Sequence, residues 1–320
     1  MSTMTSIRLP YKQDTYDKPL FADVHCAPAS SPSPRPIALI FHAGGLLVGG
    51  STIVPKAQIK YLCNHGFVVV IPNYRLAPQV SGKRSFDDCE DACDWAIAHL
   101  PEILEKQHDV KLDTQQVVAM GHSSGGTIAM HLAGAKSLKA ATAFYPSLYS
   151  SDKSTSIHQP TTAPPFCFAQ DFVPSDQDKI AISPADHQVS EFQLGAPPAV
   201  PQARNKWQMH VLKHGLWAQT VQPDGNLAAV DPMTRVSANW APIMIVQGET
   251  DVVPGSGLDL AQRAQQELKA AGVREVELEV VPGAGHMFDL APEVGTTDVT
   301  GLKWQAIAKG LDWLATHTSM

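Results

Sequence analysis

The chain has 320 residues, of which 44% are hydrophobic, and a formal net charge of −7. This length and composition allow a large buried core, whereas the acidic balance opposes contact with a phosphate backbone, so we expect no nucleic-acid partner. We also expect neither a membrane span nor a secretory signal, because no apolar stretch is long enough to cross a bilayer and the first ten residues lack a continuous apolar core.

Short apolar segments along the chain predict β-strands. The first two candidates are weak, and the later ones are continuous runs rich in branched and aromatic residues, as in strands buried on both faces. In chain order the candidates are 6–9, 20–25, 37–41, 67–71, 117–120, 140–145, 243–246 and 276–281.

Helical patterns lie between these strands, at 86–100, 127–135, 258–271 and 304–314. Strands that alternate with helices predict an α/β fold with a mainly parallel central sheet flanked by helices. The alternation breaks between residues 150 and 239, where the one clear pattern is a helix-like stretch at 203–220. Long insertions of this kind are usually lids or binding loops. We therefore expect a core formed by residues 1–149 and 240–320, with residues 150–239 as an inserted cap.

The five cysteines form no regular framework. An odd number of scattered cysteines favours free thiols in a reducing compartment, so we expect a cytoplasmic protein. Cys89 and Cys93 are four residues apart in a helical pattern, where buried packing is a better interpretation than a redox or metal role.

A candidate nucleophile is Ser123, in the segment Gly121-His122-Ser123-Ser124-Gly125. A predicted strand precedes this segment and a predicted helix follows it, which is the context of a nucleophile elbow. The sharp turn strains the serine backbone and requires small neighbours, while the helix N-terminus favours negative charge beside the hydroxyl. A plain Gly/Ser turn that only starts a helix is the alternative.

A glycine-rich turn, His42-Ala43-Gly44-Gly45-Leu46, follows the first strong strand. A tetrahedral intermediate needs preorganised N–H donors, and glycine lets the backbone approach the oxyanion closely. We expect the donors to be the amides of Gly44, Gly45 and Ser124, with His42 in a structural role. An ordinary strand–helix turn is the alternative.

Of the thirteen histidines, His286 is the candidate base, because it lies in a glycine-rich loop directly after the last predicted strand. His122 lies inside the elbow and cannot turn back to its neighbour. His210 and His214 are spaced to share one face of a helix, but Val211 stands where the zinc-protease pattern needs Glu, so we expect no metal site.

The candidate acid is Asp251, which follows the strand at 243–246, with Glu249 as second choice. An acid must fix the imidazole tautomer and stabilise its protonated form. The chain order of serine, acid and histidine is the order of α/β-hydrolases rather than that of chymotrypsin or subtilisin.

With these residues the chain resembles the hormone-sensitive-lipase-like esterases of the α/β-hydrolase superfamily. His42-Ala43-Gly44-Gly45 is similar to the family's His-Gly-Gly-Gly, with Ala43 in place of the first Gly. Residues 74–78, Tyr-Arg-Leu-Ala-Pro, match a further family segment, and the elbow, Asp251 and His286 match its catalytic positions. The resemblance spans about residues 35–150 and 240–317 and implies hydrolysis of carboxylic esters with modest acyl chains; the segment 150–239 has no counterpart that we can match.

The predicted function is therefore hydrolysis of a small-molecule carboxylic ester through an acyl-enzyme, without metal or organic cofactor. Amide or formamide cleavage and thioester or lactone cleavage by the same residues are alternatives. A non-catalytic small-molecule receptor on the same fold is an alternative of another class. Predicted substrate contacts are Leu46, Trp207, Trp217 and Met287, although the tryptophans fit a simple cap core equally well. A homodimer is compatible with the sequence.

Overall fold

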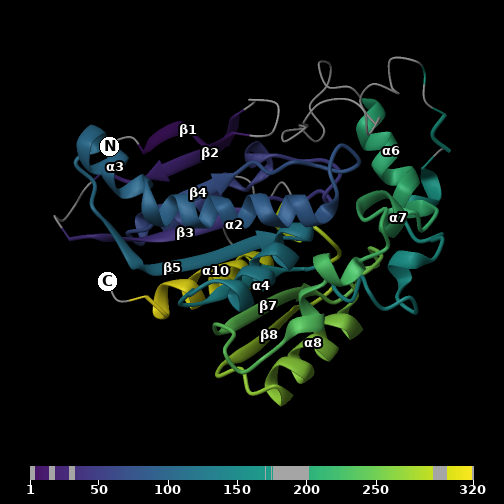
Figure 1. Cartoon of the computed structure of the whole chain (residues 1–320). Coiled ribbons are helices and arrows are strands. Elements are labelled where there is room, and N and C mark those ends of the chain that lie inside the picture. The colour runs from purple at the N-terminus through teal and green to yellow at the C-terminus, as the bar shows by residue number, and fades with distance from the viewer. Residues whose placement is uncertain are drawn as a thin grey trace.

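The computed structural model describes residues 4–13, 19–28, 33–169, 171–173, 175, 202–290 and 301–318. Within these residues eight strands form one sheet in the order β1-β2-β4-β3-β5-β6-β7-β8 (Figure 1). The strands are β1 (Thr5–Gln13), β2 (Pro19–Cys26), β3 (Arg35–Phe41), β4 (Val68–Pro72), β5 (Leu112–His122), β6 (Ala141–Phe144), β7 (Ile243–Gly248) and β8 (Val276–Val281).

Direction within the sheet changes near one edge. The pairs β1–β2 and β2–β4 are antiparallel, whereas every neighbouring pair from β4 to β8 is parallel. Because these strands are parallel, their carboxyl ends lie on the same side of the sheet, and the loops after β3, β5, β7 and β8 all emerge there. In doubly wound sheets ligands bind beside the carboxyl ends of the strands.

Helices cover both faces of the sheet. One face packs against α1 (Lys56–Asn64) and α10 (Leu302–Thr316), and their apolar residues share a buried cluster with Ala38 and Ile40 of β3. The other face packs against α2 (Gly82–Ala98), α3 (Leu100–His108), α4 (Ser124–Ala135) and α8 (Leu258–Ala270). Strands between two helical layers must be apolar on both sides, which is why β3, β4, β6 and β7 are buried along their whole length.

Residues 150–239 lie between β6 and β7, and we call them the β6–β7 segment. Its described part contains no strand; it holds α6 (Gln202–Lys213), α7 (Trp217–Val221) and the short 3-10 helices 156–158, 166–168, 227–230 and 232–235. We expected one helix over 203–220, but Gly215 adopts φ +67 and divides it into α6 and α7. Both helices lie at one end of the sheet, on the right in Figure 1.

The α/β fold with a mainly parallel sheet is confirmed, and two further helices appear in the core. Helix α1 was not expected. The helical pattern at 86–100 corresponds to α2, which ends at Ala98, and Pro101 lies in the first turn of a further helix, α3. Proline fits there because the first helical N–H groups have no partner within the helix. Two further 3-10 helices span 51–53 and 288–290.

All five cysteines are free, and four of them, Cys26, Cys63, Cys89 and Cys93, are buried. Burial raises the pKa of Cys93 to about 12, so this thiol stays protonated and behaves as a small apolar side chain. Among the helices that the structure describes, none combines the length and apolarity needed to cross a membrane.

Candidate active site

Ser123 lies between β5 and α4 with a φ of +55° and a ψ of −120°, a strained backbone conformation for a residue that has a side chain. The turn is so tight that its glycines have no room for a side chain. A Cβ at Gly121 would lie 2.1 Å from the carbonyl oxygen of Gly125, and a Cβ at Gly125 would lie 2.1 Å from that of Phe41. The backbone N–H of Ser123 donates to Phe144 of the neighbouring strand at 2.9 Å, which ties the turn to the sheet.

The loop after β8 brings His286 to this serine. Nε2 of His286 lies 2.9 Å from Oγ of Ser123, and Nδ1 lies 2.7 Å from Oδ2 of Asp251. The Asp251 side chain has no exposed surface, whereas 12% of the His286 side chain is exposed. The structure thus brings three of the predicted residues into one hydrogen-bonded chain, in which a carboxylate orients an imidazole toward a hydroxyl.

Asp251 is held by two further donors that sequence reasoning missed. The side-chain amide of Gln247 donates to Oδ2 at 3.0 Å, and the backbone N–H of Val253 donates to Oδ1 at 3.0 Å. Glu249, the second choice for the acid, is exposed and instead accepts the backbone N–H of Gly283 at 2.8 Å. The geometry therefore favours Asp251 over Glu249 as the partner of the imidazole.

The glycine-rich turn after β3 faces the elbow, and we call residues 42–48 the oxyanion loop. Gly44 and Gly45 have φ of +132 and +65, and a Cβ at Gly44 would lie 1.9 Å from the carbonyl oxygen of Val48. The N–H of Gly45 donates to Oγ of Ser124 at 2.9 Å. Two of the predicted donor residues, Gly45 and Ser124, are therefore in direct contact, through a serine hydroxyl whose role the sequence did not suggest.

His42, the first residue of the oxyanion loop, is held in place by Tyr74. Its ring stacks on Tyr74 with centroids 4.1 Å apart, and the Tyr74 hydroxyl donates to the His42 carbonyl at 2.8 Å. Burial lowers the pKa of His42 to about 4, so the ring is neutral near pH 7 and suits the structural role expected of it. The neighbouring Arg75 pairs with buried Asp88 at 2.6 Å and 2.7 Å. Residues 74–78 thus fasten the oxyanion loop to α2.

A second buried carboxylate, Asp289, lies behind His286. It accepts hydrogen bonds from the Gln58 side chain at 2.8 Å and from the Tyr145 hydroxyl, and His122 Nε2 lies 3.1 Å away. The Tyr145 ring meets the His286 ring edge-on with centroids 4.7 Å apart. His122 is therefore part of this buried network and not of the hydrogen-bonded chain that contains Ser123. A polar residue within the apolar run 287–290 was the available sequence signal.

Asp289→Asn tests the importance of this network for stability. Burial alone raises the pKa of Asp289, but attraction to His122 and hydrogen bonds from His122, Tyr145 and Gln58 outweigh it, so the pKa is lowered. The folded protein then holds this proton less tightly than the unfolded chain does. Ionised Asp289 therefore stabilises the fold above about pH 4, and this contribution is lost as pH falls below that value.

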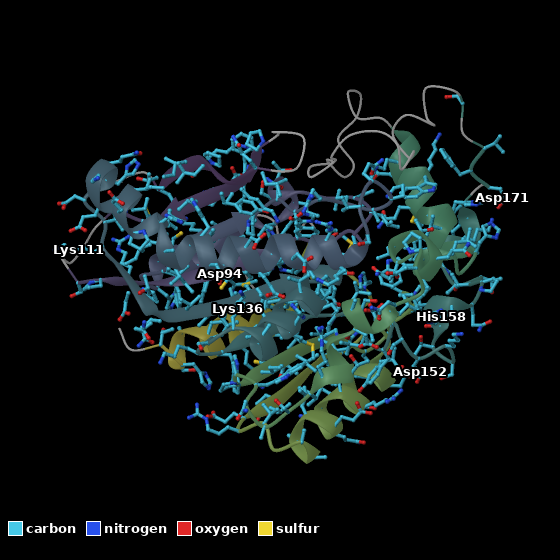
Figure 2. The ribbon with its side chains drawn as sticks, viewed as in Figure 1. Asp94, Lys111, Lys136, Asp152, His158 and Asp171 are labelled. Carbon is cyan, nitrogen blue, oxygen red and sulfur yellow. The ribbon has the colours of Figure 1, made fainter. Side chains whose placement is uncertain are left out.

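We expect Asp289→Asn to lower the free energy of unfolding at pH 7 by about 3 kcal/mol and to flatten its loss below pH 4. Urea unfolding at pH 7 and at pH 3.5 measures both effects. Asp94→Asn is a control, because Asp94 is an exposed carboxylate that pairs with Lys136 at 2.8 Å, and the two are labelled near each other in Figure 2. Equal losses in the two variants would contradict the prediction.

The four predicted substrate contacts differ in burial and in the apolar cluster to which they belong. Leu46 is only 2% exposed and packs in the core beside α2, while Met287 is half-buried against the opposite cluster. Trp207 and Trp217 are 9% and 5% exposed and join the same core cluster as Leu46. The Trp217 indole N–H donates to the carbonyl of Gly45 at 2.8 Å, so this side chain touches the oxyanion loop.

His210 and His214 lie side by side, with ring centroids 4.4 Å apart. With Asp171 they form the one group in the described residues whose ligand atoms are close enough, within 4.8 Å, to hold a metal ion. Each member already has a protein partner: Phe172 N–H donates to His210, while His214 and Lys213 both contact Asp171. Asp171 lies on the outer rim of the molecule (Figure 2), and these contacts fasten residues 171–172 to the end of α6.

Comparison with known proteins places this geometry in a family. The α/β-hydrolase fold family matches residues 38–290, which include the oxyanion loop, the elbow, Asp251 and His286. The chain belongs to the α/β-hydrolase family. This confirms the expected superfamily and agrees with the resemblance to hormone-sensitive-lipase-like esterases.

Curated relatives of this α/β-hydrolase are fungal synthases. The chain is 29% identical to methylphloroacetophenone synthase of Cladonia uncialis over 94% of its length, and 31% identical to the non-reducing polyketide synthase adrD of Penicillium rubens over 89%. It spans only 13% and 12% of those two proteins. The similarity therefore concerns one portion of a much longer chain.

Solved structures of esterases share the fold. A thermophilic esterase from Thermogutta terrifontis has a TM-score of 0.63 at 18% identity, covering 97% of this chain and 92% of that one. EstE1, a thermostable carboxylesterase from a metagenomic library, has a TM-score of 0.63 at 16% identity, covering 100% of this chain and 90% of that one. At this identity the likeness extends to the fold alone.

Proposed function

We propose that this α/β-hydrolase is a serine hydrolase that cleaves an acyl ester through an acyl-enzyme, with Ser123 as nucleophile, His286 as base and Asp251 as its orienting acid. The observation that carries the proposal is the hydrogen-bonded chain from Ser123 Oγ through His286 to Asp251, at 2.9 Å and 2.7 Å. A serine hydroxyl is a poor nucleophile at neutral pH, and a base at this distance corrects that.

Catalysis proceeds in two steps. Ser123 Oγ attacks the acyl carbonyl while His286 Nε2 takes the hydroxyl proton, and the resulting oxyanion is stabilised by amides of Gly44, Gly45 and Ser124, for which the Gly45 N–H exchanges the Ser124 hydroxyl for the oxyanion. His286 then gives its proton to the leaving alcohol, which leaves the acyl group on Ser123. Water activated by His286 attacks this acyl-enzyme, releasing the acid and restoring the serine. In this proposal α6 and α7, which contact the oxyanion loop, serve as part of a cap beside the site.

A second candidate, hydrolysis of an acyl thioester, is compatible with the curated relatives, several of which are named non-reducing polyketide synthases. We carry over from them only the class of acyl group, an aromatic or polyketide-like acyl chain. A thiolate is a better leaving group than an alkoxide because thiols have much lower pKa values, about 8.5 for cysteine. The same nucleophile and base serve both reactions, so the two candidates differ in the leaving atom, oxygen or sulfur.

Matched substrates separate these candidates. A benzoyl group is offered as its p-nitrophenyl ester, its N-acetylcysteamine thioester and its p-nitroanilide, and kcat/KM is measured for each. We expect ester and thioester turnover and no measurable anilide turnover. A thioester preference beyond that of uncatalysed hydrolysis favours the second candidate. Preference for the anilide, or binding without turnover of any substrate, contradicts the proposal and favours an amidase or a receptor.

A further inference from the structure

The backbone carbonyls of the oxyanion loop are bound by side chains of the β6–β7 segment. The Gln208 side-chain amide of α6 donates to the Gly44 carbonyl at 3.1 Å, and the Trp217 indole N–H of α7 donates to the Gly45 carbonyl at 2.8 Å. These contacts bridge more than 160 residues of sequence and join α6 and α7 to the end of the sheet where they lie (Figure 1). Gln208 binds the peptide that carries the Gly45 N–H, and Trp217 binds the next peptide, which carries the Leu46 N–H, so the two contacts hold the backbone on both sides of Gly45.

A buried cation anchors the same contact. Arg204 of α6 has no exposed surface; its Nε donates to the Leu47 carbonyl and its Nη2 to the Ala77 carbonyl, each at 2.6 Å. Burial lowers the pKa of Arg204 to about 10, so it stays protonated at neutral pH. A hydrogen bond from a charged donor to a carbonyl is stronger when it is shielded from water than when it is exposed. These bonds therefore hold α6 firmly against the oxyanion loop.

Because of peptide geometry, the contact of Gln208 with the Gly44 carbonyl also sets the direction of the Gly45 N–H. The peptide bond is planar and trans, so an N–H points opposite to the carbonyl of the preceding residue. Holding the Gly44 carbonyl toward Gln208 therefore aims the Gly45 N–H the other way, toward the elbow, where it meets Oγ of Ser124 at 2.9 Å. Glycine places few steric limits on this peptide. Its carbonyl also accepts the N–H groups of Leu47 and Val48 at 3.1 Å, so Gln208 adds a donor from the β6–β7 segment to a turn that the loop itself closes.

We propose that Gln208 and Trp217 are positioning residues that fix the oxyanion-loop amides for catalysis, so that docking of the β6–β7 segment and competence of the oxyanion hole are coupled. The inference rests on the proposed serine hydrolase function. Donors that are already aimed at the oxyanion stabilise the transition state without reorganisation, whereas a misdirected peptide loses this stabilisation and leaves ground-state binding intact.

Trp217→Phe tests the proposal by removing the indole N–H while keeping an aromatic ring. Trp240→Phe is the matched control, because Trp240 is also 5% exposed and its indole also donates to a backbone carbonyl, that of Arg235, at 3.2 Å. Gln208→Met removes the second donor at a half-buried position, where folding is less at risk than at a buried tryptophan. Kinetics use p-nitrophenyl acetate. An aryl trifluoromethyl ketone, which forms a tetrahedral oxyanion adduct with serine, is compared with the corresponding methyl ketone.

We expect Trp217→Phe and Gln208→Met each to lower kcat about tenfold with KM changed less than twofold, as expected for loss of a hydrogen bond realised in the transition state. Affinity for the trifluoromethyl ketone falls by the same factor, and affinity for the methyl ketone is unchanged. Trp240→Phe lowers the melting temperature without changing kcat or either affinity.

Two results would overturn the inference. One is that Trp217→Phe and Gln208→Met keep the kcat and the trifluoromethyl-ketone affinity of Trp240→Phe. The other is that they raise KM alone and weaken both ketones equally, which is the pattern of a substrate contact. A wild-type protein that neither turns over the ester nor binds the trifluoromethyl ketone refutes the proposed function itself, so the two failures are distinguishable.

Discussion

Replacement of Ser123 by alanine is expected to lower kcat by up to about a million-fold, the scale measured when the nucleophile of a serine hydrolase is removed. The reason is that His286 then has no hydroxyl to deprotonate, and a direct attack by water lacks the acyl-enzyme route. Steady-state hydrolysis of p-nitrophenyl acetate measures the loss, and circular dichroism shows whether the fold is kept.

We expect that fold to survive Ser123→Ala. The elbow is held by its backbone, through the Ser123 N–H to Phe144, and by the close approach of Gly121 and Gly125 to their neighbours. The serine side chain adds only its contact with His286. An alanine variant with near-wild-type turnover would refute the role of Ser123, whereas an unfolded variant would show that the hydroxyl is structural.

Asp251→Asn is expected to lower kcat about ten-thousand-fold, because an amide at this position presents a donor to Nδ1 and favours the wrong imidazole tautomer. The damage is expected to be large here because Asp251 holds His286 at 2.7 Å with a fully buried side chain. Glu249→Gln is the matched control, since it makes the same change two residues away on an exposed side chain. We expect Glu249→Gln to stay within about threefold of wild type; the reverse ranking would make Glu249 the acid.

The fold could be predicted largely from local patterns. Runs such as 37–41 and 243–246 are apolar without alternation, and the structure buries both strands completely, as a sheet covered on both faces requires. Helix α1 was missed because it has nine residues and only three buried apolar side chains, Ile59, Leu62 and Cys63, too few for a clear periodic pattern.

Some parts of the candidate site could be predicted from local sequence, and others could not. The elbow, the glycine-rich turn at 42–46 and the base are each recognisable within five neighbouring residues, because a tight turn at a strand end needs glycine at fixed positions. The supporting contacts are different: Gln208 meets Gly44, and Asp289 meets Gln58, across more than 160 residues. A single polar side chain carries no local sign of such a distant partner, so these contacts emerge only from the folded chain.

The β6–β7 segment was expected to be a cap that walls a substrate pocket. Its two tryptophans are buried in the same core cluster, but Trp217 also reaches the oxyanion loop through its indole N–H. If this contact positions the loop, exchange of the segment between relatives would change turnover as well as substrate choice. Each substitution in the segment should therefore be measured by kcat and KM separately.

The central claim is that one serine, activated by one imidazole, carries the acyl group. Labelling with a fluorophosphonate, intact-mass measurement and peptide mapping test it most directly. We predict one adduct per chain on Ser123, none in Ser123→Ala, and labelling at least a hundredfold slower in His286→Ala. An ester-hydrolysing protein that is labelled at another residue, or that stays unlabelled, would contradict this account.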